Sequence, residues 1–460
     1  MNQTNISSTL SPYKKGSIRE LYSIFYPMML ACFSGCLMLF SDRVLLANYS
    51  TQSMNIATLA GNVFWVFSLG CISISSIAEI FVGRFSGNKE YQNIGIVTWQ
   101  MLWFSMFSII IFWPLSFAPH IFMPEHYLNE GGKEFFFYLM LSGPLFSATA
   151  ALGGFFIGRG KAKIVASVLF IGNIINIILD FLLIFGLGDL IPELGIKGAS
   201  IATVISEGFK VVILFSIFIS KVNRDVFGTY IVGFHKKIFL DCIITGAPRS
   251  AGHVIELTSS IVVLSLLAQL DKLYVTIFSI GSTTFFFFSF LLDGLSRAVS
   301  AISSNFIGSK EYSFIKQTLF SSYKLLAIII LLLSIPLIIY PDFLIELWIS
   351  KEYFELSNLN VKQILKINFI WVWIFFILKG YVWVISGFLV AAKDTRFMLI
   401  ISIVSSWIFS VLPIYILIFN QVDFLKIIWT IMCIHVFFEL ICYFCRQNIL
   451  IKKYLYKRGR

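Results

Sequence analysis

The chain has 460 residues, of which 58% are hydrophobic and only 13% are charged, and its mean hydropathy is +0.86. This composition excludes a soluble domain, in which about half of the residues at most are apolar, and predicts a polytopic membrane protein. The net charge of +11 does not indicate nucleic-acid binding, because the basic residues recur in short clusters between apolar runs, as membrane anchors do. Most of the cysteines lie inside apolar segments, so we predict no disulfide framework and no metal site.

Twelve apolar runs are long enough to cross a bilayer, which takes about twenty helical residues. The first run is too long for the core of a signal peptide, so we expect it to be retained as a spanning helix. The sequence therefore predicts an all-α polytopic membrane protein with twelve transmembrane helices. They lie near residues 20–46, 56–82, 93–118, 134–157, 163–187, 196–220, 238–270, 274–307, 314–340, 364–390, 397–419 and 425–450.

Lysine and arginine are unequally distributed between the two sides of the predicted bundle. The terminal segments and the connectors on their side carry 22 of these residues, and the connectors on the other side carry 7. Because connectors rich in Lys and Arg remain in the cytoplasm, both termini are expected there. We expect an integral protein of a bacterial inner (plasma) membrane.

Two pairs of motifs indicate an internal repeat. Gly87–Tyr91 (GNKEY) recurs as Gly308–Tyr312 (GSKEY), and Pro27 in the first helix recurs as Pro248 in the seventh. Both pairs are separated by 221 residues. An offset of six helices preserves topology, so the two halves are predicted to be related by a pseudo-two-fold axis along the membrane normal.

The repeat predicts a division of the chain into two bundles. An N-terminal six-helix lobe takes residues 1–220, a cytoplasmic connector takes 221–237, and a C-terminal six-helix lobe takes 238–460. Two parallel lobes of this kind enclose a substrate cavity between them, and they suit alternating access.

The fifth predicted helix contains polar residues in an otherwise apolar run. Asn176 and Asp180 are four residues apart, so on a helix they share one face, and Asn173 lies one turn before Asn176. A carboxylate at this depth is costly in lipid and persists where it faces a cavity, a partner or an ion. The alternative is a helix–helix contact stabilised by the asparagines.

Other predicted helices also carry charges. On the seventh, Arg249, His253 and Glu256 lie on one face, and they form either a polar stripe against a neighbouring helix or the lining of a cavity. On the eighth, Asp293 and Arg297 are four residues apart and are predicted to pair. Two further pairs are predicted by proximity in sequence: Glu207 with Lys210, and Glu79 with Arg84.

Further motifs are spread over the whole chain, and together they are specific. They are Pro27 with Asp42 fifteen residues later, Gly158–Lys163 (GRGKAK), Asn176–Gly186 (NIILDFLLIFG), Gly195–Thr203 (GIKGASIAT), Gly246–Pro248 followed by Glu256, and Ser386–Gly387 followed by Lys393–Asp394. In this combination the chain resembles the multidrug and toxic compound extrusion (MATE) family.

The resemblance implies two six-helix bundles in a V, and a secondary antiporter that exports cationic or amphiphilic organic compounds in exchange for Na⁺ or H⁺. It implies a coupling-cation site at Asp42, Asn176, Asp180 and Thr203. Asp180 lies 17 residues from Lys163, or roughly 25 Å along a helix, which places it in the outer half of the membrane. The expected partners are a small-molecule substrate and membrane lipids, with no nucleic acid, and we expect a monomer that needs no cofactor besides the coupling ion.

One departure from the family pattern concerns the C-terminal lobe. Some sodium-driven members have an aspartate seven residues before Ser386, where this chain has Lys379. An unpaired charge in an apolar helix is costly, so we predict that Lys379 contacts Glu256 across the lobe. We expect Arg249 and His253 to lie at the same site.

Two other functions compete with the antiporter. A flippase for a lipid-linked saccharide, which has a related two-lobe fold, would need several cavity cations for pyrophosphate, and Arg249, Arg297 and Lys379 are candidates. A membrane-integral transferase would need a nucleophile, histidine or paired-carboxylate motif near an interface, and the connectors contain none. We therefore predict no catalytic residues and no enzyme activity.

Overall fold

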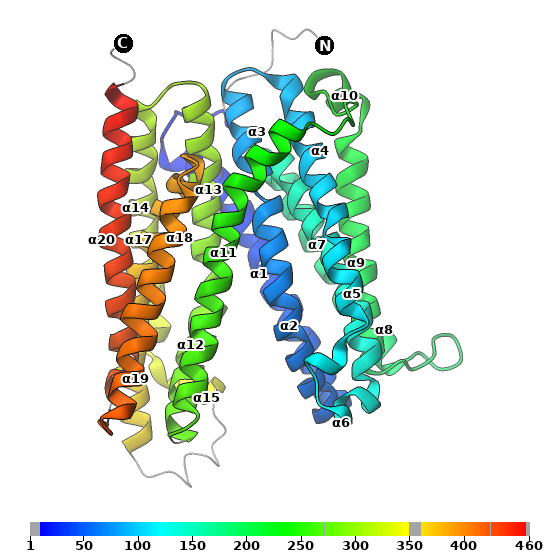
Figure 1. Ribbon diagram of the computed structural model, residues 1–460, viewed down its shortest axis with the longest axis vertical. Helices are drawn as coiled ribbons and strands as arrows, with labels where there is room; N and C mark the ends of the chain where they lie inside the picture. Colours follow the sequence, from blue (N-terminus) through cyan, green and yellow to red (C-terminus); the bar gives the residue numbers. More distant parts are fainter. Residues whose placement is uncertain (1–9, 271, 349–359, 424, 457–460) are drawn as a thin grey trace.

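The computed structural model describes residues 10–270, 272–348, 360–423 and 425–456, which form a bundle of long α-helices (Figure 1). In this part of the chain, eleven helical segments are long and apolar enough to span a membrane. A twelfth span is formed by α12 (Lys272–Phe288) and α13 (Phe290–Gly308), which meet at a bend of 45°. The predicted twelve-helix, all-α architecture is confirmed.

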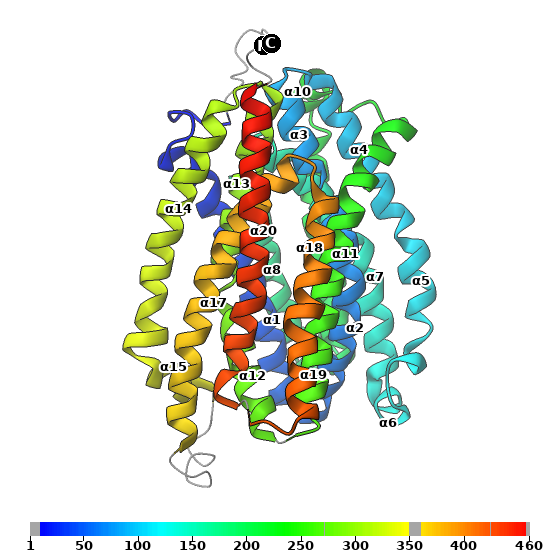
Figure 2. The ribbon, with the colours of Figure 1, turned by 60° about the vertical axis from the view of Figure 1, so that its left-hand side comes forward.

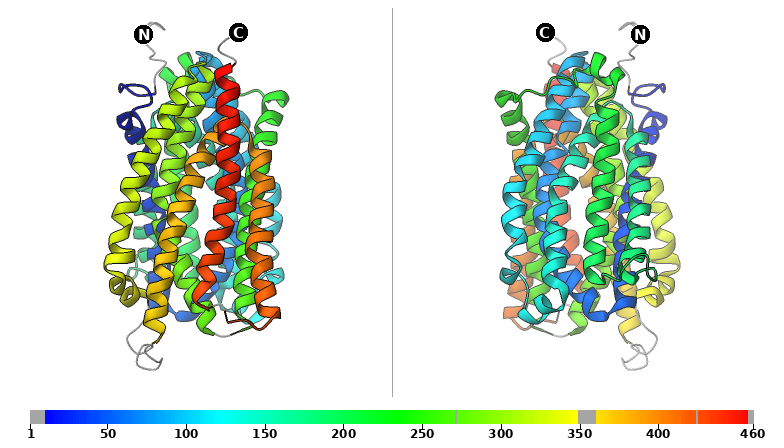
Figure 3. Two further views of the ribbon diagram at one scale, coloured as in Figure 1. Left: turned by 90° about the vertical axis from the view of Figure 1, so that its left-hand side faces the viewer. Right: turned by 90° about the vertical axis from the view of Figure 1, so that its right-hand side faces the viewer.

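The first six spans form one lobe. They are α1 (Ile18–Tyr49), α2 (Thr51–Ser75) with α3 (Ala78–Gly87), α4 (Tyr91–Phe107) with α5 (Ile109–Ser116), α7 (Lys133–Ile157), α8 (Ala162–Phe185) and α9 (Ile196–Phe218). A short α6 (Glu125–Tyr127) precedes α7. These helices are blue to green in Figure 1 and cover one side of the molecule in Figure 3.

The second lobe contains the remaining spans. They are α11 (Lys236–Leu267), the bent pair α12 and α13, α14 (Ser313–Ser334), α17 (Asn360–Ala391), α18 (Thr395–Ser406) with α19 (Leu412–Phe419), and α20 (Ile428–Tyr456). A short α15 (Pro341–Trp348) follows α14. Helix α17 packs against α13, α14 and α20 and forms the centre of this lobe (Figure 2).

The region 221–237 joins the two lobes. It contains α10 (Lys221–Phe227) and the first residues of α11. Arg159, in the turn between α7 and α8, stacks 3.6 Å from the Phe227 ring centroid and holds α10 against the first lobe. The boundaries that we drew at 221 and 237 remain a prediction.

The lobes meet at the end of the bundle where α1 begins and α20 ends, and their ribbons diverge toward the opposite end (Figure 1). At this junction α1 and α3 pack against α13, and α2 packs against α11. Glycine makes the close approach possible, because a Cβ atom at Gly308 would lie 2.1 Å from the Arg84 carbonyl oxygen. At this end, the described residues of the two lobes therefore approach backbone to backbone.

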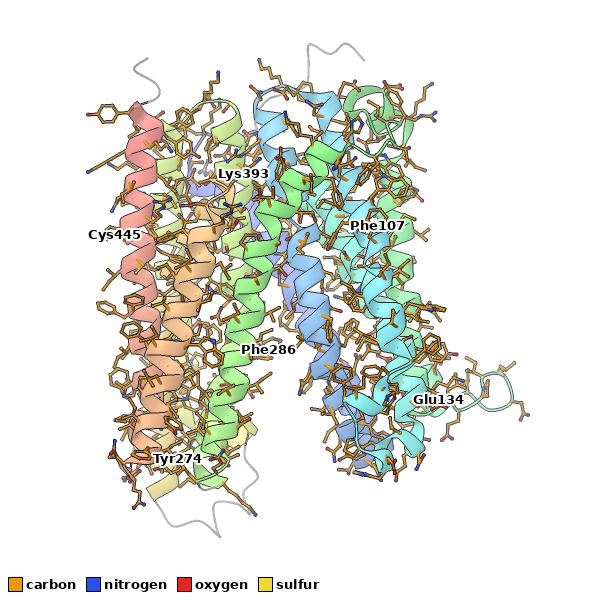
Figure 4. The ribbon with its side chains drawn as sticks, in the orientation of Figure 1. Phe107, Glu134, Tyr274, Phe286, Lys393 and Cys445 are labelled. Carbon is orange, nitrogen blue, oxygen red and sulfur yellow. The ribbon has the colours of Figure 1, made fainter. Side chains whose placement is uncertain are left out.

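Polar contacts also cross the junction. The Arg84 guanidinium donates to the Ala391 carbonyl at 2.6 Å, and Lys15 forms an ion pair with Glu311 at 2.6 Å. Lys393, in the turn between α17 and α18, places its Nζ 3.4 Å from the Phe81 ring centroid (Figure 4). These contacts would all break if the lobes separated at this end.

The repeated GNKEY and GSKEY motifs adopt the same turn. Lys89 and Lys310 have left-handed backbones, with φ of 63° and 60°. In both turns a glutamate N–H donates to a phenylalanine carbonyl five residues earlier, at 2.9 Å for Glu90 and 3.0 Å for Glu311. The repeat found in the sequence is therefore also a repeat in local structure.

Candidate functional site

The four residues predicted to bind the coupling cation come from three neighbouring helices of the first lobe. Asp42 lies on α1, Asn176 and Asp180 lie on α8, and Thr203 lies on α9. Helix α8 packs against both α1 and α9. Asn176 and Asp180 lie on one face of α8, as their spacing predicts. The fold brings these residues into one region of the lobe.

The carboxyl groups of Asp42 and Asp180 lie close together, because the amide of Asn176 reaches an oxygen atom of each. Two ionised carboxylates that share one site repel each other, so a proton or a cation stabilises the pair. Asp180 and Asn176 are both fully buried. With its amide nitrogen toward the pair, Asn176 donates to Asp180 Oδ2 and to Asp42 Oδ1, both at 3.2 Å. The two carboxyl groups are therefore suited to binding one proton or one monovalent cation between them.

The site retains oxygen atoms that can bind a ligand. Asp180 Oδ1 has no hydrogen-bond partner among the described residues. The Thr203 hydroxyl donates to the Ala199 carbonyl at 3.1 Å, which leaves its oxygen free to accept or to coordinate. Asp42 and Thr203 line a cavity of about 510 Å³. Carboxylate and hydroxyl oxygens are suitable ligands for a small hard cation.

The cavity beside Asp42 contains a residue that sequence analysis did not assign. Arg43 lines it and donates to Thr58 Oγ1 at 2.9 Å. The remaining wall is largely aromatic, from Phe64, Trp65, Phe135 and Phe146. In the sequence, the position of Arg43 directly after Asp42 could have indicated that it lies at this site.

A buried polar network lies one helical turn from Asn176. Lys210 Nζ is 2.5 Å from Glu207 Oε1 and 2.6 Å from Asn173 Oδ1, which confirms the predicted Glu207–Lys210 pair. Asn173 in turn donates to Ser34 Oγ at 2.8 Å. Asn173 therefore links α8 to α9 and to α1 just beside the carboxyl pair.

In the second lobe, Lys379 lies between two carboxylates. Its Nζ is 2.5 Å from Glu256 Oε1 and 3.1 Å from Glu439 Oε2, and its side chain is 4% exposed. The predicted contact between Lys379 and Glu256 is present. The sequence marks Glu439 only as a weak proton-relay candidate with His435. Its contact with Lys379 was not predicted, because nothing in the spacing of α20 shows which neighbour that face of the helix meets.

Arg249, His253 and Glu256 line one cavity of about 460 Å³ together with Lys379 and Glu439. Of the two interpretations of this stripe, the cavity lining fits the structure. His253 Nδ1 also lies 3.0 Å from Ser73 Oγ of α2, so the stripe reaches across to the first lobe.

The predicted pair of Asp293 and Arg297 is confirmed at 3.1 Å. Cys32 of α1 donates its thiol to the same carboxylate, also at 3.1 Å. The predicted pair of Glu79 and Arg84 is wrong, because Arg84 donates to Ala391 while Glu79 lines a cavity of about 310 Å³ with Arg249 and Arg297. Two side chains five residues apart point about 140° away from each other around the helix axis. Glu79 and Arg84 therefore face different neighbours.

A two-lobed bundle of spanning helices, with a buried carboxyl pair in one lobe and charged cavities in and beside the other, defines an integral membrane transporter. A family model described as MatE matches residues 27–182 and 248–416. The chain belongs to this family of multidrug and toxic compound extrusion transporters, which are not enzymes.

The chain is similar to curated proteins of bacteria. It is 28% identical over 195 residues to a probable multidrug resistance protein NorM of Thermotoga maritima, a match that covers 41% of this chain and 42% of the relative. It is 22% identical over 316 residues to a FAD transporter of Shewanella oneidensis, with 67% and 69% covered. The first of these matches spans less than half of the relative's length.

Solved structures share the fold over the whole chain. An outward-facing conformation of a multidrug resistance MATE family transporter superposes with a TM-score of 0.86 at 16% identity, and 99% of each chain is covered. A transporter from Pyrococcus furiosus, described as having a binding pocket of reverse polarity, gives a TM-score of 0.84 at 16% identity and 99% coverage of both chains. At this identity the likeness concerns the fold.

Proposed function

We propose that the chain is a secondary active antiporter that exports organic compounds in exchange for Na⁺ or H⁺. The observation that carries the proposal is the close approach of Asp42 and the buried Asp180 around Asn176, with Asp180 Oδ1 left without a partner in the described structure. Relatives described as multidrug resistance proteins support export of organic, cationic or amphiphilic compounds.

Coupling follows from the electrostatics of the pair. Two carboxylates in one low-dielectric site repel each other when both are ionised, so either a proton or Na⁺ must neutralise them. When that ion is lost, the two carboxylates Asp42 and Asp180 repel each other. This repulsion shifts the equilibrium between two arrangements of α1 and α8. Asn176 can serve either ion, because its amide nitrogen donates to the carboxylates and its oxygen can coordinate Na⁺.

The orientation in the membrane determines which side the divergent ends of the lobes face. We place the end at which the lobes touch in the cytoplasm, because the connectors at that end are the ones rich in Lys and Arg. In this orientation the lobes diverge toward the outside of the cell. The protein is expected to work as a monomer in a plasma membrane.

The flippase is the weaker candidate. Two of its three proposed cavity cations are already neutralised, Lys379 by Glu256 and Glu439, and Arg297 by Asp293. Arg249 remains, and one arginine is too little charge for a pyrophosphate.

The test is transport by purified protein in vesicles under separately imposed Na⁺ and pH gradients, with a small panel of dyes. We expect Asp42→Asn and Asp180→Asn to abolish gradient-driven export and to leave dye binding within a few-fold. Asp189→Asn, in an exposed loop, is the matched control and should behave as wild type. Retained gradient-driven export by the Asp180→Asn protein would remove this pair from the mechanism and return it to a packing role.

A further inference from the structure

The first turn of α11 projects from the side of the bundle, near the end at which the lobes touch (Figure 2). It follows residues 228–235, which leave α10 and run along α4 without helical structure. Indole N–H groups of α4 hold this segment, because Trp99 donates to the Thr229 carbonyl at 2.8 Å and Trp103 donates to the Val232 carbonyl at 3.1 Å. The segment that joins the lobes is therefore fixed to the side of one helix.

Gln100 of α4 sets the level at which α11 begins. Its buried amide donates to the Gly233 carbonyl at 3.1 Å and accepts the His235 N–H at 2.9 Å. Gln100 lies nine residues after Tyr91, the first residue of α4, which is about 14 Å along the helix axis. Helix α11 therefore begins below the end of the bundle, beside the outer surface of α4.

Two adjacent lysines open α11 at this level. Lys236 and Lys237 are exposed, and neither forms an ion pair or a hydrogen bond with any residue that the structure describes. Asp241, the nearest acid in the sequence, interacts electrostatically with Lys393. Lysines near the ends of spanning helices extend their ammonium groups to the lipid headgroups. Lys236 and Lys237 therefore present two unneutralised positive charges to this layer.

Three phenylalanine rings form an aromatic cluster beside the lysines. The ring centroids of Phe234 and Phe239 are 5.0 Å apart, and each lies 6.2 Å from the ring centroid of Phe107. Phe107 and Phe234 are 46% and 50% exposed. Phe107, labelled in Figure 4, lies seven residues beyond Gln100 on α4, so the aromatic cluster extends from the level of the lysines toward the middle of the membrane.

Unpaired cations at the headgroup level, with exposed rings deeper in the membrane, are complementary to one class of molecule. A phospholipid with a net negative charge pairs its phosphate with the ammonium groups and lays an acyl chain on the rings. A zwitterionic phospholipid brings an ammonium group of its own to the lysines, and like charges that meet in this way repel each other. The surface therefore distinguishes phospholipids by the net charge of the headgroup.

We propose that the start of α11 binds an anionic phospholipid of the cytoplasmic leaflet, with the phosphate on Lys236 and Lys237 and an acyl chain on the aromatic cluster. The inference uses the orientation given above, and it is independent of the exported compound and of the coupling ion. Because this segment joins α10 of the first lobe to α11 of the second, the bound lipid ties the junction of the lobes to the bilayer surface.

The probe is a pair of lipids that differ only in the headgroup: anionic dioleoylphosphatidylglycerol and zwitterionic dioleoylphosphatidylcholine. Equal amounts of the two are added to purified, delipidated protein in detergent, and the bound lipid is counted by native mass spectrometry. We expect the first lipid bound by wild type to be phosphatidylglycerol with at least a tenfold preference. The double variant Lys236→Gln/Lys237→Gln should reduce this preference to within twofold.

A second pair of adjacent lysines supplies the matched control. Lys452 and Lys453, near the end of α20, are also exposed. The double variant Lys452→Gln/Lys453→Gln loses the same charge and should keep the preference at tenfold or more. Phe234→Ala should weaken the binding of both lipids by a similar factor, because their acyl chains are identical.

Several results would overturn the proposal. Equal binding of the two lipids by wild type would show that the headgroup charge is not recognised. An equal loss of preference in the two lysine double variants would assign the attraction to the overall positive charge of the protein. Displacement of the lipid by millimolar glycerol 3-phosphate, which has the phosphate without the acyl chains, would assign the site to a soluble anion.

Discussion

Lys379 Nζ lies 2.5 Å from Glu256 Oε1 in the middle of the second lobe, and Glu439 Oε2 lies 3.1 Å from the same nitrogen. The ammonium group is tethered to α17 and occupies the position between two carboxylates where a mobile cation would otherwise bind. Among the described residues, no Lys or Arg side chain forms an ion pair with Asp42 or Asp180 in the first lobe. This asymmetry supports ion coupling through the first lobe alone.

The Lys379–Glu256 pair predicts the outcome of a charge swap. Lys379→Met should destabilise the protein by about 3 kcal/mol, because it leaves the buried Glu439 carboxylate and the partly buried Glu256 carboxylate unpaired. Lys379→Glu combined with Glu256→Lys should retain more export and a higher unfolding temperature than either single change. Thermal unfolding in detergent and dye export from vesicles measure both. A double variant no better than the single ones would contradict the pairing.

Asn176 predicts how the coupling ion can be identified. Asn176→Ala removes an amide whose oxygen can turn to coordinate Na⁺ and whose nitrogen donates to Asp42 and Asp180. A proton bonds directly to one carboxyl group, so its binding depends less on this amide than Na⁺ binding does. Na⁺-driven export should therefore fall at least tenfold, which corresponds to about 1.4 kcal/mol, while H⁺-driven export should remain within a few-fold. Asn48→Ala, on the exposed face of α1, is the control. Equal loss under both gradients would show that the amide does not discriminate between the ions.

The close packing at Gly308 suggests a substitution that favours separation of the lobes. A Cβ atom there would lie 2.1 Å from the backbone oxygen of Arg84, which cannot move aside as a flexible side chain could. Gly308→Ala should therefore weaken the contact between the lobes. Spin labels at Lys89 and Lys310, in a cysteine-free background, should show a longer distance. Gly208→Ala is the matched control, because its Cβ would have no neighbour within 4 Å.

Lys393 predicts a pH dependence of the same contact. Burial, with a smaller contribution from Arg84, lowers the pKa of Lys393 to about 8 from 10.5, against the opposite influence of Cys242 and Asp241. The charged form is thus disfavoured when the lobes touch, and below pH 8 this penalty is present in full. As the pH rises from about 8 toward 10.5, the penalty is lost and the contact should become more populated.

The same spin-label distances, recorded between pH 7 and 10, measure this change. Lys393→Met should remove the pH dependence, because it keeps the apolar stem and has no titratable group. A transition that persists in the Lys393→Met protein would assign it to another group.

The amino-acid sequence was sufficient to predict the membrane-spanning helices and the local geometry. The bilayer fixes how many apolar residues a helix needs, so the twelve runs could be read directly. The four-residue spacing of Asn176 and Asp180 placed them on one face, and the five-residue motifs at Gly87 and Gly308 predicted the repeat that appears as two matching turns. Each of these features depends on neighbours in the chain.

Which face of each helix meets which neighbour was decided only by the tertiary structure. In a membrane both faces of a helix are apolar, so periodicity does not point to the packed side. Glu79 was therefore assigned to Arg84, five residues away, when it faces Arg249 and Arg297 across the lobe boundary. The second acid on Lys379, Glu439, lies 60 residues away in the chain, and it met the lysine only because α17 and α20 pack side by side.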